Sequence, residues 1–207
     1  MSEASETPQD KRNHYHSLRM ARKKAQIDAS IARAQNEKGV MIVMTGNGKG
    51  KSTSAFGMVA RALGHGLKVG VCQFIKSRTD TGEEAFFSAQ PNCEWHVLGD
   101  GFTWDTQDRQ QDMDTSQKGW QVALTMLTDA DYDLVVLDEL TYLLSYDYLD
   151  QDTVLDALIA RPPQQHLVVT GRSATAQLRD IADTVSDIRD EKHAYTAGIK
   201  AQKGVDY

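Results

Sequence analysis

A glycine-rich stretch, GNGKGKST, occupies residues 46–53 and directly follows an apolar run at residues 40–45. The residues after it predict a helix over 52–64. A strand that ends in a tight glycine turn and opens a helix points several backbone N–H groups at one spot, where the helix dipole adds positive potential. The stretch therefore predicts a strand–loop–helix unit whose loop holds phosphates.

The side chains of this loop agree with that prediction. Lys51 supplies an ammonium group, Lys49 adds a second cation, and Ser52 offers a hydroxyl to Mg²⁺. The pattern departs from the usual G-x-x-x-x-G-K-[ST] at its first position, where Thr45 stands. A glycine turn without a ligand is the weaker alternative. We predict that the nucleotide-binding residues of the loop are Gly46, Asn47, Gly48, Lys49, Gly50, Lys51, Ser52 and Thr53.

Short apolar runs alternate with helical stretches from Gly39 onward. The runs lie at residues 40–45, 69–75, 93–98, 134–138 and 166–170, the helical stretches at 52–64, 111–128, 151–161 and 174–182, and a final extended stretch at 184–189. This alternation predicts an α/β fold with a mostly parallel central sheet flanked by helices. Together with the glycine-rich loop, we expect a fold of the RecA-like P-loop type. Continuous apolar runs such as LVVLDE indicate strands that are covered on both faces.

Charged residues follow three of the predicted strands. Asp138 and Glu139 end the run LVVLDE, Lys76 ends CQFIK, and Arg172 ends VVTGR. Ligands of open parallel sheets bind beyond the carboxyl ends of the strands. One of the two acids is therefore expected to meet the metal, because successive strand residues point to opposite sides. Lys76 and Arg172 are candidates to neutralise phosphates, although each alone is more often a surface charge.

Composition narrows the remaining classes of function. The net charge of −6 disfavours a general nucleic-acid coat. No apolar run approaches the roughly 20 residues that span a bilayer, and the polar, acidic start is unlike a secretory signal. The only cysteines, Cys72 and Cys93, lack Cys-x-x-Cys spacing and indicate reduced core thiols. We expect a cytoplasmic protein without membrane or nucleic-acid partners.

Residues 1–38 form a separate segment in the sequence, and residues 39–207 form the predicted phosphate-binding domain. The segment holds eight Lys/Arg and five Asp/Glu. Residues 1–13 have almost nothing to bury and are expected to be disordered, whereas residues 15–37 suit a weakly amphipathic helix. Two interpretations stay open: a solvated tail, or a mobile arm that docks over a site on this chain or on a partner subunit.

The segment GDGFTWDTQ, residues 99–107, combines a glycine turn with two aromatic residues. Phe102 and Trp104 are two residues apart, so in an extended backbone they point the same way. They form either an aromatic wall beside the ligand or two rings tucked into the core.

The sequence resembles the ATP:corrinoid adenosyltransferases of the CobA/CobO/BtuR type. The resemblance extends from Gly39 to Tyr207 and is carried by TGNGKGKST, FGMVARALGHGLKVGVCQFIK, GFTWDTQ, VVLDELTYLLSYDYL, VVTGR, ADTVSDIR and KHAYTAGIKAQKGVDY. GFTWDTQ and GIKAQKGVDY are its most specific parts. Ser52 stands where the family usually has threonine, which preserves the hydroxyl.

The resemblance implies a reaction and a set of roles. The 5′-deoxyadenosyl group of ATP would pass to the Co(I) of a reduced corrinoid, tripolyphosphate would leave, and Mg²⁺ or Mn²⁺ would bind at Ser52 and Glu139. Phe102 and Trp104 would exclude the lower cobalt ligand, and Lys51 would stabilise the triphosphate. The resemblance also implies a homodimer, an arm that orders over the corrinoid, and reduced flavodoxin or flavin as reductant. The corrinoid is a biosynthetic intermediate, salvaged cobalamin, or both.

Two other functions are compatible with the motifs. A P-loop ATPase or small-molecule phosphotransferase shares the phosphate loop and the acidic strand end, but it needs a base or a water-positioning group that the sequence does not single out. A corrinoid carrier or regulator would bind ATP without turnover.

Overall fold

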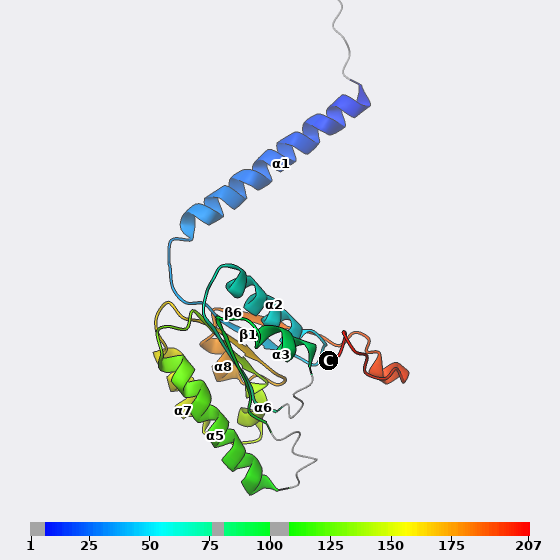
Figure 1. The fold of residues 1–207 in the computed structure, drawn as a ribbon. Coiled ribbons are helices and arrows are strands. Elements are labelled where there is room, and N and C mark those ends of the chain that lie inside the picture. The colour runs from blue at the N-terminus through cyan, green and yellow to red at the C-terminus, as the bar shows by residue number, and fades with distance from the viewer. Residues whose placement is uncertain (1–6, 76–80, 100–107) are drawn as a thin grey trace, which may run out of the picture. The chain divides into compact units, whose positions relative to one another are not determined.

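The computed structural model describes residues 7–75, 81–99 and 108–207 (Figure 1). Lys76, Phe102 and Trp104, which the sequence singles out, lie outside the described residues. The chain divides into two compact units, Met1–Glu37 and Lys38–Tyr207. Each unit is described by itself below.

Six parallel strands form the central sheet of the second unit. In chain order they are β1 (Met41–Thr45), β2 (Val69–Gln73), β3 (Cys93–Val97), β4 (Leu134–Asp138), β5 (His166–Thr170) and β6 (Thr184–Asp187). Their order across the sheet is β3-β2-β4-β5-β1-β6, and every pairing is parallel. The predicted parallel α/β fold is confirmed, and the last predicted extended stretch forms the edge strand β6.

Helices cover both faces of this sheet. Among the described residues they are α2 (Lys51–Gly64), α3 (Gly82–Phe87), α5 (Arg109–Thr128), α6 (Leu140–Ser145), α7 (Gln151–Ala160) and α8 (Ala176–Asp180), followed by the short 3₁₀ helix η1 (Tyr195–Ala197). The four helices predicted in this unit are confirmed to within two residues at every end. The sequence did not predict α3 and α6, because six residues are too few to display a helical period. None of the described helices is long and apolar enough to cross a membrane.

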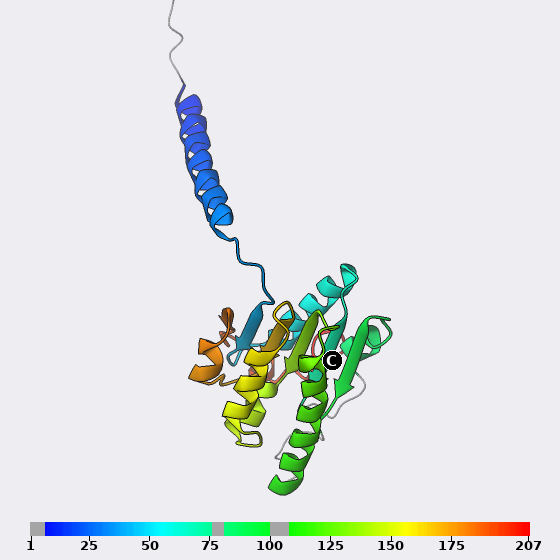
Figure 2. The ribbon, with the colours of Figure 1, turned by 90° about the vertical axis from the view of Figure 1, so that its left-hand side faces the viewer.

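Two apolar clusters lie on opposite faces of the sheet, because strand residues alternate between faces. Val135 and Leu137 of β4 pack with α5, α6, α7 and α8, whereas Leu134 and Val136 pack with α2 and α3. Figure 2 looks onto the face that α5 and α7 cover. Both faces of the central strands are thus buried, which explains their unbroken apolar runs.

In the described part of the first unit, residues 7–37, there is one helix, α1, which runs from Pro8 to Arg33. It begins earlier than the sequence predicts, because Thr7 and Asp10 form a reciprocal capping box and Pro8 suits the first turn. It ends at Arg33 instead of residue 37, because Ala34 leaves the helical conformation with φ −82° and ψ 86°. No residue of α1 is buried.

Candidate functional site

The phosphate loop connects the carboxyl end of β1 to the first turn of α2. Gly50 precedes the helix with φ +121°, and no side chain among the described residues caps the helix. The first N–H groups of a helix have no partner within it, so a first turn without a cap leaves them available to an anion. This arrangement is the one that the sequence predicted for residues 46–53.

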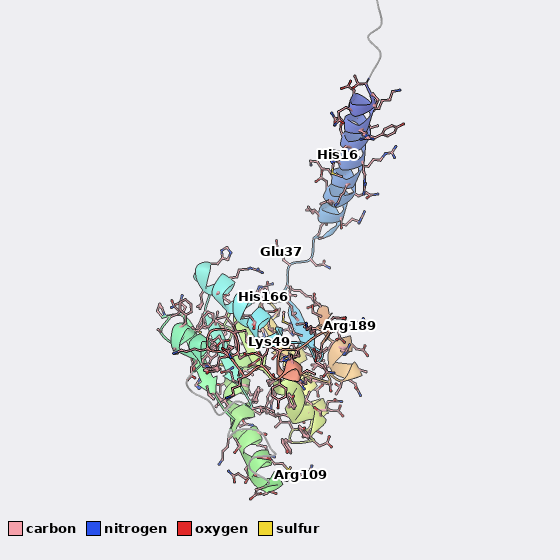
Figure 3. All side chains as sticks on the ribbon, turned by 90° about the vertical axis from the view of Figure 1, so that its right-hand side faces the viewer. His16, Glu37, Lys49, Arg109, His166 and Arg189 are labelled. Atoms are coloured by element: carbon pink, nitrogen blue, oxygen red, sulfur yellow. The ribbon has the colours of Figure 1, made fainter. Side chains whose placement is uncertain are left out.

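The glycines of the loop are required by a close backbone neighbour. A Cβ on Gly46 would lie 2.4 Å from the carbonyl oxygen of Ile188, and one on Gly48 would lie 2.3 Å from that of Arg189. The Gly48 N–H also donates to the Ile188 carbonyl at 2.7 Å. The segment after β6 therefore shapes the loop; Lys49 of the loop and Arg189 of that segment are labelled in Figure 3.

Lys51 is the most enclosed cation of the loop. Its side chain is 7% exposed, and Nζ donates to the carbonyl oxygen of Gly48 at 2.7 Å. Burial lowers the pKa of the Lys51 ammonium, Glu139 opposes this, and Arg172 lowers the pKa further. The cation is thus bound to the loop and stabilised by two nearby acids, Glu139 and Asp138, before any ligand binds.

The two acids after β4 have different surroundings. Asp138 is fully buried and accepts hydrogen bonds from Gln73 Nε2 at 2.9 Å and Thr170 Oγ1 at 2.6 Å. Glu139 takes a left-handed conformation with φ +64°, and its N–H donates to Thr170 Oγ1 at 3.0 Å. The change of backbone direction brings Glu139 to the wall of a cavity beside the loop, and Asp138 is not part of that wall.

Arg172 reaches the same pocket from the end of β5. Gly171 precedes it with φ +138°, and a Cβ there would lie 2.0 Å from Thr141 Oγ1. The Thr141 hydroxyl donates to the Arg172 carbonyl at 2.6 Å, which ties this turn to the start of α6. Arg172 and Glu139 therefore come from the ends of neighbouring strands. Both lie close enough to Lys51 to shift the pKa of its ammonium group.

One cavity of about 230 Å³ joins most of the predicted residues. Its walls are Asn47, Gly48, Lys49, Gly50, Lys51, Ser52, Thr53, Glu83, Glu139, Arg172, His193, Val205 and Asp206. Gly46 is absent from the wall because it packs against the segment after β6.

Sequence reasoning missed four residues of this wall: Glu83, His193, Val205 and Asp206. Asp206 pairs with Lys49 at 2.7 Å. The last three lie in the stretch KHAYTAGIKAQKGVDY, residues 192–207, and the family resemblance of that stretch was the only signal for them. A local sequence pattern gives no information on contacts between residues that are distant in the chain.

The donor groups of the cavity fit a hard divalent cation. Ser52 offers a hydroxyl and Glu139 a carboxylate, and one carboxylate oxygen of Glu139 is shielded from solvent. Among the described residues, no group of three His, Cys, Asp or Glu side chains is arranged to hold a metal. Mg²⁺ commonly takes one or two protein ligands together with substrate phosphates and water, so this donor set suits a nucleotide-bound Mg²⁺.

Comparisons with known proteins agree on one family. Residues 37–207 match the family model described as ATP:corrinoid adenosyltransferase BtuR/CobO/CobP. The corrinoid adenosyltransferase of Pseudomonas aeruginosa is 55% identical over 204 residues, which cover 98% of this chain and all of that protein. The corrinoid adenosyltransferase of Escherichia coli K12 is 50% identical and that of Salmonella typhimurium 49% identical, each over 91% of this chain and 96% of the relative.

Proposed function

Because this chain belongs to the ATP:corrinoid adenosyltransferase family, and is therefore an enzyme that adenosylates corrinoids with ATP, we propose that it transfers the 5′-deoxyadenosyl group to Co(I) and releases tripolyphosphate. The observation that supports this most strongly is the cavity in which the phosphate loop, Lys51, Glu139 and Arg172 meet. The cavity offers cations and amides to a triphosphate.

The proposed reaction does not require general acid–base catalysis by the protein. The electron pair of Co(I) attacks C5′, a Co–C bond forms, and the C5′–O bond breaks. Its electron pair leaves with tripolyphosphate, and cobalt becomes formally Co(III). No proton has to be removed from the nucleophile, so the protein is needed for alignment and for stabilising the leaving charge.

Lys51, the loop amides and Arg172 would perform the second task. Lys51 already lies within the loop, so its charge needs little rearrangement when the phosphates arrive. Preorganised donors of this kind stabilise developing charge because the cost of orienting them is met during folding. Asp138 has a structural role in this proposal, since its carboxylate binds Gln73 and Thr170 inside the sheet.

Ser52 and Glu139 would hold Mg²⁺ or Mn²⁺ beside the triphosphate. The ion would supply further neutralisation of phosphate charge. Glu139→Gln is expected to raise the Mg²⁺ concentration needed for half-maximal ATP binding, and Asp138 offers no substitute because it is buried. Calorimetric ATP titrations at several Mg²⁺ concentrations measure this directly.

Three family expectations complete the proposal. Phe102 and Trp104 form an aromatic wall that favours four-coordinate Co(II) and so eases its reduction by flavodoxin or a flavin. Helix α1, which buries none of its residues, docks over the corrinoid when it binds. The enzyme is a homodimer, which sedimentation of the full chain would test.

The function is tested anaerobically with ATP, Mg²⁺ and chemically generated cob(I)alamin. A photolabile alkylcorrinoid together with intact tripolyphosphate is the expected result. ADP and phosphate, with an unchanged corrinoid, would overturn the proposed transfer and favour a phosphotransferase.

A further inference from the structure

A carboxylate from the segment near residue 207 engages the phosphate loop. Asp206 Oδ1 lies 2.7 Å from Lys49 Nζ, and both side chains are partly exposed, 28% for Asp206 and 44% for Lys49. Hydrogen bonds from Lys49 and from the Gln202 N–H lower the pKa of Asp206, so its carboxylate is charged at neutral pH. The contact joins residues of the same cavity wall.

Asp206 belongs to a small turn that its own side chain helps to close. The Gln202 N–H donates to Asp206 Oδ2 at 2.8 Å, and the Asp206 N–H donates to the Gln202 carbonyl at 2.8 Å. The Gly204 N–H donates to the Tyr207 carbonyl at 2.8 Å. The ion pair with Lys49 links this turn, residues 202–207, to the phosphate loop.

A triphosphate bound at Lys49 would compete with this carboxylate for the same cation. A phosphate oxygen that takes Lys49 must displace Asp206 Oδ1 from its 2.7 Å position or share the ammonium with it. A phosphate chain also repels a carboxylate in the same cavity, since like charges a few ångström apart interact unfavourably. Both effects act against Asp206 keeping its place once ATP is bound.

We propose that Asp206 is a releasable counter-ion of the phosphate loop: it pairs with Lys49 in the ligand-free enzyme, gives way to the triphosphate, and pairs again as tripolyphosphate leaves. Asp206 is then a residue that limits affinity for the polyphosphate end of ATP and of the product. The inference rests on the proposed assignment of the loop to the phosphates, and it adds a role for the turn at residues 202–207.

The pair has a consequence for turnover. Of the two products, tripolyphosphate would carry more negative charge than the adenosylcorrinoid. It would bind the same backbone amides and cations that hold the phosphates of ATP. Re-formation of the Lys49–Asp206 pair offsets part of the cost of breaking those contacts. Removing the Asp206 charge is therefore expected to tighten ATP and tripolyphosphate binding together and to strengthen product inhibition.

The first test compares full-length variants by calorimetry with Mg²⁺–ATP and with tripolyphosphate. Asp206→Asn is expected to bind both about two- to five-fold more tightly, a modest gain because exposed ion pairs are weak. Asp206→Glu, which keeps the charge, is expected to bind as the wild type does. Asp28→Asn is a matched control, because it removes a similarly short exposed lysine pair, Lys24–Asp28 at 2.6 Å, in helix α1.

The second test follows the turn itself by hydrogen–deuterium exchange. Tripolyphosphate is expected to speed exchange of the amides of Gln202, Gly204 and Asp206, whose hydrogen bonds close the turn. Slower or unchanged exchange would overturn the release. Unchanged or weaker polyphosphate binding by Asp206→Asn would equally refute competition, and weaker binding would mean that Asp206 positions Lys49 for the phosphates.

Lys51→Ala separates this inference from the proposed function. If Lys51→Ala still binds tripolyphosphate like the wild type, the phosphate assignment of the loop fails and the inference fails with it. If tripolyphosphate binding depends on Lys51 and Asp206→Asn gives the expected gain, the inference stands, even where the cob(I)alamin assay yields no adenosylcorrinoid.

Discussion

Thr170→Val tests the hydrogen bonds that separate the two acids after β4. The Thr170 hydroxyl donates to buried Asp138 at 2.6 Å and accepts from the Glu139 N–H at 3.0 Å. Thr170 itself is fully buried. Valine keeps the branched shape and the strand propensity of threonine and replaces only the hydroxyl, with a methyl group.

The expected loss of stability follows from those two bonds. A hydrogen bond to a charged group contributes about 1.5–3 kcal/mol, and the second bond, to a backbone N–H, adds about 0.5–1.5 kcal/mol. Because valine offers some apolar compensation, we expect the free energy of unfolding to fall by about 2–4 kcal/mol. For a unit of this size, the corresponding fall in Tm is about 5–15 °C.

Urea denaturation and thermal melting measure the effect, with Thr125→Val as the matched control. Thr125 is exposed, and its hydroxyl donates to the Val122 carbonyl within α5 at 2.7 Å, so its loss is expected to change stability by less than about 0.5 kcal/mol. Thr170→Val is also expected to weaken Mg²⁺–ATP binding, because Glu139 loses a backbone anchor. Equal stability of the two variants would refute the argument that Thr170 organises the acid pair.

Four further predictions concern the adenosyl transfer, the reduction of cobalt, the N-terminal arm and the two cysteines. Lys51→Ala is expected to lower kcat/KM for adenosyl transfer by about 10²–10³-fold, measured with chemically supplied Co(I), since one preorganised donor is lost; a loss below ten-fold would contradict its role. Trp104→Ala is expected to impair turnover from Co(II) more than turnover from Co(I), and equal losses would remove the aromatic wall from the mechanism. Deletion of residues 1–36 is expected to weaken corrinoid binding and to leave ATP binding intact in calorimetric titrations; unchanged corrinoid affinity would favour a solvated tail. Burial raises the pKa of Cys72 to about 12 and of Cys93 to about 11, so at pH 8 both thiols stay protonated and iodoacetamide should modify them far more slowly than in urea, as mass spectrometry can follow.

The strands of the sheet were predictable because burial determines the residue types along each parallel strand. A strand covered on both faces must be apolar throughout, so β4 and β5 appear as unbroken runs that end in a charged or glycine residue. The phosphate loop was predictable for a similar reason, since its glycines and lysines are neighbours in the chain. Helices α3 and α6 were not, because six residues carry too little periodicity.

The features of the site that the sequence did not predict depend on contacts between segments that are distant in the chain. Nothing in the sequence near Gly48 indicates that the Ile188 carbonyl accepts its N–H, or that a Cβ would meet Arg189. The pairing of Lys49 with Asp206 likewise joins segments that lie near opposite ends of the sequence of the second unit, Lys38–Tyr207. Such contacts follow from the order of strands in the sheet, which places β6 beside β1.

The choice between Asp138 and Glu139 illustrates the difference between a local rule and the fold. Strand alternation predicts that only one of two successive acids faces the phosphates, but not which one. In the structure, Asp138 binds Gln73 of β2 and Thr170 of β5, so neighbouring strands hold its carboxylate inside the sheet. Glu139, held at φ +64° by the same threonine hydroxyl, lies at the cavity wall. Thr170 therefore acts on both acids, which is why its hydroxyl is expected to matter for stability and nucleotide binding alike.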